Sequence, residues 1–156
     1  MIWYALVPVV LALSAPGVAA DGPIELLGSM ERWAQSGGSE GSFVLDAGTL
    51  SLKKAEGLPG ELLTAADYEN FELRFEFNVA SWTATGLYLH APRNRQYPAG
   101  LELELSGHPT EHDTPYTTGA IFRRIPPRVN ARKKPGEWNT CEIHMDWPHL
   151  HVTMNG

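Results

Sequence analysis

Runs in which apolar and polar residues alternate one by one dominate this sequence. The clearest run is NFELRFEFNVA, residues 70–80. In an extended chain its apolar side chains lie on one face, namely Phe71, Leu73, Phe75, Phe77 and Val79. Its polar side chains lie on the other face, namely Glu72, Arg74, Glu76 and Asn78. A two-residue repeat of this kind is typical of a β-strand with one buried face.

Similar runs follow along the chain, separated by Gly, Pro, Asn and Asp. They are SFVLDAGTLSLKK (two short strands in 42–54), TGLYLHA (85–91), GLELEL (100–105), TGAIFRR (118–124), WNTCEIHMDW (138–147) and HLHVTMNG (149–156). Helical periodicity is weak, and only ELLTAADYENF (61–71) is expected to hold one helical turn. Successive strands without intervening helices predict an all-β sandwich or jelly roll.

The first 20 residues, MIWYALVPVVLALSAPGVAA, have the composition of a secretory signal peptide. An apolar run leads to small residues, with Val18 and Ala20 placed for cleavage before Asp21. Pro8 and Pro16 interrupt the run, which makes a permanent transmembrane anchor the less favoured alternative. We therefore expect a signal peptide over 1–20, one β-sandwich domain over 21–156, a periplasmic or secreted location, and no stable membrane insertion after the signal is removed.

Charge and cysteine content narrow the class of protein further. The formal net charge of −6 argues against nucleic acid as the main partner. Cys141 is the only cysteine, so no internal disulfide is possible, and its place in an alternating run predicts a small buried apolar side chain. Half of the basic residues lie in IFRRIPPRVNARKKPG (121–136), which we interpret as a solvated surface loop or, alternatively, a contact for an anionic partner.

The sequence ends on Asn155-Gly156, the strongest two-residue hairpin signal. A sandwich that lacked the returning strand would expose a long edge. The expectation is that the closing strands are missing from this sequence, which would then be a fragment.

Two glutamates in GLELEL form the first candidate for chemistry. Leu101, Leu103 and Leu105 should face the core, while Glu102 and Glu104 share the other face with Cα atoms about 6.6 Å apart. Paired carboxyl groups at such distances carry out glycoside hydrolysis. The alternative interpretation is simply the solvated face of a half-buried strand.

Histidines and aromatic residues supply further candidates. His149 and His151 share one strand face, as do His144 and Asp146, but solvated side chains are the favoured interpretation, and neither a metal nor a cofactor is predicted. His108 follows the GLELEL strand and could overhang a site there. The aromatic residues placed to stack on a sugar ring are Trp82, Tyr88, Tyr97 and Tyr116. The sequence has no Ser-His-Asp order, phosphate-binding glycine loop or Cys-based metal motif.

Six segments, taken in order, resemble the 3-keto-disaccharide hydrolase domain family. They are YENFELRFEFNV, TGLYLHAP, GLELEL, TGAIFRRIPP, KPGEWNTCEI and VTMNG, and the similarity covers residues 24–156. The resemblance implies a concanavalin A-like jelly roll in an exported protein that acts on 3-keto glycosides or disaccharides. The implied partner is a small carbohydrate; the oligomeric state is not predicted.

The resemblance also assigns roles residue by residue. Glu102 and Arg74 match family positions, whereas Glu104 stands where the family has Gln, His90 where it has Arg, and Ala84-Thr85-Gly86 where it has N-S-G. It implies that Glu102 is a general base or an anchor for the substrate and that His90 or Glu104 donates a proton. Arg74 and Tyr88 are then substrate contacts, and His108 is a further candidate contact from its position after the GLELEL strand. Two alternatives remain open, a non-catalytic lectin-like module and a structural domain split from a larger protein.

Overall fold

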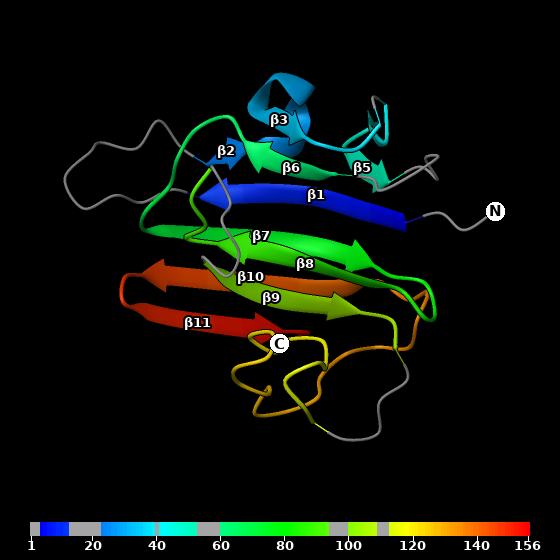
Figure 1. Cartoon of the computed structure of the whole chain (residues 1–156), viewed down its shortest axis with the longest axis vertical. Coiled ribbons are helices and arrows are strands. Elements are labelled where there is room, and N and C mark those ends of the chain that lie inside the picture. The colour runs from blue at the N-terminus through cyan, green and yellow to red at the C-terminus, as the bar shows by residue number, and fades with distance from the viewer. Residues whose placement is uncertain (1–3, 13–22, 40, 53–59, 94–99, 109–112) are drawn as a thin grey trace.

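A computed structural model describes residues 4–12, 23–39, 41–52, 60–93, 100–108 and 113–156. Antiparallel strands make up nearly all of its regular structure. The largest sheet within the described residues has seven strands, which Figure 1 shows as the broad layer across the molecule. In spatial order they are β11 (His149–Met154), β10 (Asn139–Asp146), β7 (Phe71–Asn78), β1 (Tyr4–Ala12), β5 (Thr49–Leu52) and β4 (Phe43–Asp46), with β2 (Ile24–Glu25) paired to β1.

A second layer lies over this sheet and is built from β8 (Ala84–Leu89) and β9 (Leu101–Ser106). Figure 1 shows β8 and β9 in front of β7 and β10, with the long loops that follow β9 at the lower end of the molecule. A further two-stranded sheet pairs β3 (Trp33–Ser36) with β6 (Glu61–Thr64), and two short 3₁₀ turns, η1 (Leu26–Gly28) and η2 (Met30–Arg32), precede β3. The predicted all-β sandwich of the jelly-roll type is confirmed.

The core lies between the two layers, where the alternating patterns of the strands meet. Every second residue of β7 and β10 is buried, and the apolar side chains among them pack in one cluster with Leu89, Leu103 and Leu105 of the opposite layer. Phe77 is 0% exposed, and burial of such a side chain stabilises the fold by about 1.5–3 kcal/mol. Cys141 is buried as predicted, and burial with the nearby Glu142 charge raises the pKa of its thiol to about 12.

Two local expectations are wrong, both because long-range pairing overrides local pattern. The segment 61–71 was expected to hold one helical turn but has none, and its residues 61–64 form β6, since Leu62 and Leu63 pair with Gln35 and Ala34 of β3. The TGAIFRR segment was expected as a strand, but Ile121 makes only isolated bridges, to Leu103 and Ile125, and the residues around it are turns.

Part of the predicted signal peptide, residues 4–12, forms β1 between β5 and β7 in this structure. Residues 1–3 and 13–22 lie outside the described part of the chain. Cleavage before Asp21 therefore stays a prediction. Among the described residues, none of the helices has the length and apolar character needed to span a bilayer.

Candidate functional site

The two glutamates of GLELEL lie on the face of β9 that points away from the core. Within the β8–β9 ladder Tyr88 is the direct partner of Glu102, and Gly86 is the direct partner of Glu104. Directly paired residues project from the same face of a sheet. Tyr88, Glu102 and Glu104 therefore form one polar cluster, while Leu103 and Leu105 are buried in the core on the other side, as predicted.

A third segment pairs with β9, and the exposure of this face differs from residue to residue: Glu102 is half-buried and Glu104 is buried. The backbone of residues 119–122 runs along the edge of β9 that β8 leaves open. The Glu104 N–H donates to the Ala120 carbonyl at 2.9 Å, and the Phe122 N–H donates to the Glu102 carbonyl at 2.8 Å. Glu104 is only 5% exposed, so the interpretation of GLELEL as the wet side of a strand is wrong for this residue.

Burial changes the proton affinity of Glu104. Removal from water, and then the negative charge of Glu102, raise the pKa of its carboxyl group from 4.5 to about 7. Within the described residues no hydrogen bond or ion pair reaches this carboxyl group to hold it ionised. A carboxyl group with this pKa can donate or accept a proton near neutral pH, which is what acid–base catalysis requires.

Gly86 gives Glu102 the space it occupies. A Cβ atom added at Gly86 would lie 2.4 Å from Glu102 Oε1 and 2.7 Å from its Cγ. The Glu102 side chain therefore lies directly across the backbone of β8, beside its own strand. Sequence reasoning missed this role of Gly86, although the glycine inside an alternating strand is a signal for close approach of another group.

His90 takes no part in this cluster. It ends β8 with a φ of 50°, its Nε2 lies 2.8 Å from the Glu69 carbonyl oxygen, and its ring stacks on Trp147 with centroids 4.6 Å apart. None of its contacts within the described residues is with Glu102 or Glu104. The positive φ breaks the alternation that would have placed His90 beside Tyr88.

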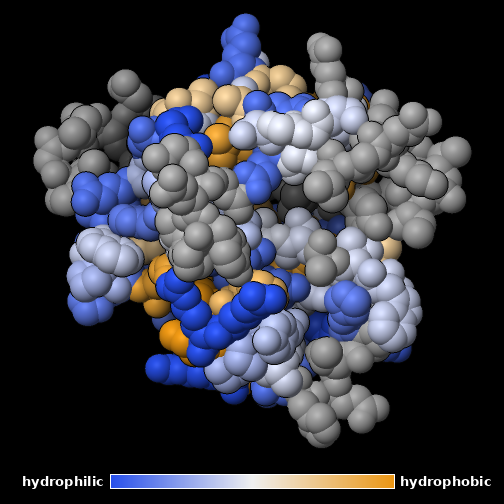
Figure 2. Space-filling view, viewed as in Figure 1, coloured by the Kyte–Doolittle hydropathy of each residue, from blue (hydrophilic) through white to orange (hydrophobic). Residues whose placement is uncertain are grey.

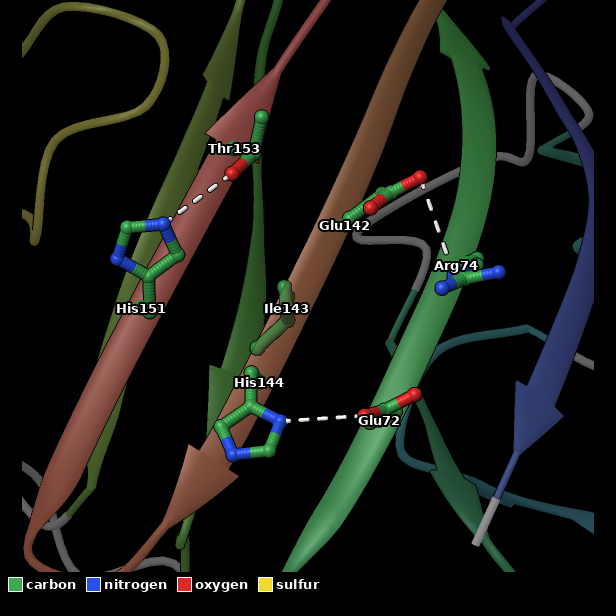
Figure 3. Close-up of a pocket in the computed structure, with 7 residues that line it drawn as sticks. All are labelled: Glu72, Arg74, Glu142, Ile143, His144, His151 and Thr153. Atoms are coloured by element: carbon green, nitrogen blue, oxygen red, sulfur yellow. Dashed lines mark hydrogen bonds and ion pairs between the residues drawn. The ribbon is translucent and has the colours of Figure 1, made fainter. Parts of the chain in front are cut away.

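Arg74 lies on the opposite outer face of the sandwich. It alternates with the buried Leu73 and Phe75 of β7, so its side chain points away from the layer that holds Glu102. Figure 3 shows it beside Glu142 of β10, with Arg74 Nε and Glu142 Oε1 3.8 Å apart. The packed core separates the two faces, and Arg74 therefore cannot contact a ligand bound at Glu102.

The same outer face carries the histidines considered for a metal site. His144 Nδ1 lies 3.4 Å from Glu72 Oε1, and His151, paired with His144 across β10 and β11, lies 3.3 Å from the Thr153 hydroxyl (Figure 3). Together with Arg74, Glu142 and Ile143 these side chains line a shallow pocket. Among the described residues no three His, Cys, Asp or Glu side chains are grouped so that they could hold a metal ion.

His108 and Trp82 lie together at the far end of the β8–β9 ladder. Their rings meet edge to face with centroids 5.6 Å apart, and Trp82 is 73% exposed. The His108 N–H donates to the Ser106 hydroxyl at 3.1 Å, which ties it to the end of β9. His108 therefore lies two residues beyond the end of β9, and its contact with a substrate stays a prediction.

A comparison with known families decides what kind of domain this is. A family model described as the 3-keto-alpha-glucoside-1,2-lyase-like domain matches residues 22–156. The chain belongs to this family. No curated protein matches the sequence closely enough to count as a relative.

Solved structures agree with this 3-keto-alpha-glucoside-1,2-lyase-like domain in fold. A candidate glycosyl hydrolase from Parabacteroides distasonis superposes with a TM-score of 0.72 at 19% identity, over 94% of this chain and 74% of that one. A second candidate glycosyl hydrolase from the same organism gives 0.59 at 26% identity, over 82% of this chain and 61% of that one. The sequence thus spans well under the full length of both.

Proposed function

We propose that this 3-keto-alpha-glucoside-1,2-lyase-like domain cleaves 3-keto glycosides, with Glu102 and Glu104 as its acid–base pair. One observation carries the proposal: the buried carboxyl group of Glu104, with a pKa of about 7, lies on the same strand face as the carboxylate of Glu102. Environments that push two carboxyl groups apart in pKa commonly separate an acid from a base. The family description names the matching chemistry, lysis of a 3-keto glucoside.

The reaction follows from the acidity that a ketone confers on its neighbours. Glu102 removes the hydrogen from C2, which the C3 ketone acidifies. The electron pair of that C–H bond forms a C1–C2 double bond while the C1–oxygen bond breaks. Protonated Glu104 gives its proton to the departing oxygen. Addition of water at C1 then completes a net hydrolysis.

Geometry favours Glu104 over His90 as the proton donor. Glu104 shares a strand face with Glu102, whereas the His90 imidazole is held by the Glu69 carbonyl and the Trp147 ring. A donor must reach the leaving oxygen of the same sugar that the base contacts. Tyr88, directly opposite Glu102 in the ladder, is the remaining substrate contact among the predicted residues on this face.

A lectin-like module is the second candidate, favoured by the exposed ring of Trp82 beside His108. Exposed aromatic faces bind sugar rings by stacking without any chemistry. The two functions differ in how they respond to loss of Glu102. For an enzyme, Glu102→Gln removes turnover and leaves sugar binding intact; for a lectin, the same change weakens binding, and no turnover exists in the parent protein.

Incubation of the full chain with an aryl 3-keto glucoside, from about pH 5 to about pH 8, tests the enzyme directly. Release of the aryl alcohol is the expected result, and it should disappear in Glu102→Gln. Sugar binding with no release at any of these pH values would overturn the enzyme and leave the lectin.

Gly86→Ala should impair the site without touching either carboxyl group chemically. The new methyl group occupies the space of the Glu102 side chain, which must swing away from its position across β8. A displacement of about 1 Å of a reacting group can lower the rate about a hundredfold. We expect a fall of that order in kcat/KM for the 3-keto glucoside.

The neighbouring change Thr85→Ala is the matched control, because Thr85 belongs to the same strand but alternates with the Gly86 face. It should keep kcat/KM close to the parent value. Equal activity of Gly86→Ala and Thr85→Ala would show that the position of Glu102 does not matter.

Export is proposed as well, on the composition of residues 1–20. The expected result is a secreted or periplasmic protein whose mass corresponds to a start at Asp21, measured after expression in a bacterium with an intact secretion system. In that mature protein β5 and β7 would lose β1, their shared neighbour, and would need another partner. A mass that retains residues 1–20 would refute cleavage.

A further inference from the structure

The loop between β9 and β10 concentrates the positive charge of the protein. Residues 121–134, here named the basic loop, hold six of the 12 Lys and Arg residues and no Asp or Glu. The six are Arg123, Arg124, Arg128, Arg132, Lys133 and Lys134. The basic loop thus carries +6, and because the whole chain carries −6, the remainder carries −12.

Large aliphatic side chains stand exposed among these cations. Ile125 is 61% exposed and Val129 73% exposed, and they flank the exposed Arg128. Figure 2 shows the molecule from the same side as Figure 1. Hydrophobic and strongly hydrophilic residues lie side by side in its lower part, where Figure 1 draws the loops after β9. A soluble polyanion would be bound by the cations alone, whereas a lipid–water interface also accepts the aliphatic side chains.

The basic loop is held at both ends, so binding would require little additional ordering. At its start the Phe122 N–H donates to the Glu102 carbonyl, and the Arg123 guanidinium lies 5.2 Å from the Phe122 ring centroid. At its end the Asn155 side-chain amide donates to the Ala131 carbonyl at 2.7 Å. A surface that is already ordered avoids most of the entropy loss that weakens binding by a flexible loop.

We propose that the basic loop docks this protein on the surface of an anionic phospholipid membrane. The cations attract anionic headgroups, each strengthening binding about fivefold near the surface. Ile125 and Val129 enter the boundary between headgroups and acyl chains. The −12 charge of the remainder is repelled by the same surface, which orients the protein with the basic loop towards the lipid.

Co-sedimentation of the full chain with vesicles of equal parts phosphatidylcholine and phosphatidylglycerol tests the proposal. We expect binding to these vesicles, none to pure phosphatidylcholine, and loss of binding in roughly 1 M salt, where the Debye length falls to about 3 Å. Arg128→Gln should weaken binding about fivefold and Arg123→Gln/Arg128→Gln about 30-fold. Arg32→Gln changes an exposed arginine outside the basic loop; it is the matched control and should leave binding within about twofold.

Substitution of the aliphatic side chains distinguishes a membrane from other anionic partners. Ile125→Ser/Val129→Ser should weaken vesicle binding at least about tenfold, while Met30→Ser, also at an exposed position, should not. Circular dichroism checks that each variant is folded. Binding that survives the Ile125/Val129 change, or that dextran sulfate reproduces with equal affinity, would overturn the proposal in favour of a general polyanion site. Self-association that the arginine changes abolish, without vesicle binding, would overturn it in favour of a second acidic copy of the chain.

Discussion

Glu104→Gln is expected to make the protein inactive and, above neutral pH, more stable. Glutamine keeps the shape of the buried side chain but can neither donate nor accept the catalytic proton, so kcat/KM for a 3-keto glucoside should fall about 10²- to 10⁴-fold. In the parent protein, activity should decline as the pH rises through about 7, because Glu104 then loses the proton that it gives to the leaving oxygen.

The stability effect follows from the raised pKa. Burial lifts the pKa of Glu104 from 4.5 to about 7, so the folded protein holds this proton more tightly than the unfolded chain does. The resulting contribution to the free energy of unfolding is about 3 kcal/mol. It is complete below about pH 4.5 and is lost as the pH rises through 7. Glutamine has no such dependence.

Urea unfolding at a series of pH values measures the effect as a difference between parent and variant. The free energy of unfolding of Glu104→Gln should exceed that of the parent by a few kcal/mol at about pH 8, and the gap should close towards about pH 4.5. Glu76→Gln, an exposed glutamate on the outer face of β7, serves as the control and should leave both activity and the pH profile unchanged. Parallel profiles of parent and Glu104→Gln would contradict a raised pKa in the folded state.

Gly107→Ala should strongly destabilise the fold. A Cβ atom at this position would lie 1.9 Å from the Ala80 carbonyl oxygen, a backbone atom that cannot move aside without shifting the turn between β7 and β8. The same turn is tied to β9 by the Gly107 N–H, which donates to the Thr83 carbonyl at 2.7 Å. We expect a loss of about 3 kcal/mol in the free energy of unfolding.

Gly28→Ala is the matched control, because its added Cβ would come no closer than 3.6 Å to the Glu25 side chain. It should change the midpoint of thermal unfolding little, whereas Gly107→Ala should lower it by roughly 10 °C or more. The turn also carries the exposed Trp82, so sugar binding should weaken in Gly107→Ala if Trp82 contributes to it. Equal stability of the two alanine variants would show that the turn relaxes easily.

The strands and their buried faces were predictable because each depends on a few neighbouring residues. The alternation in NFELRFEFNVA predicted a strand that the structure places at Phe71–Asn78, with the predicted side chains buried. The same reasoning assigned the leucines of GLELEL to the core. It failed at residues 61–64. Their conformation is decided by pairing with β3, a strand that lies nearly 30 residues earlier in the sequence.

By itself, then, the sequence determined the all-β class, the family and the presence of two carboxylates on one strand face, because alternation and motif order are local properties. Only the tertiary structure decided that residues 119–122 pair with β9, that burial raises the pKa of Glu104, that Gly86 gives Glu102 its space, and that His90 and Arg74 lie apart from both. The physical reason is that alternation fixes which face of a strand a side chain occupies. It leaves open which layer that strand joins and what covers its other face.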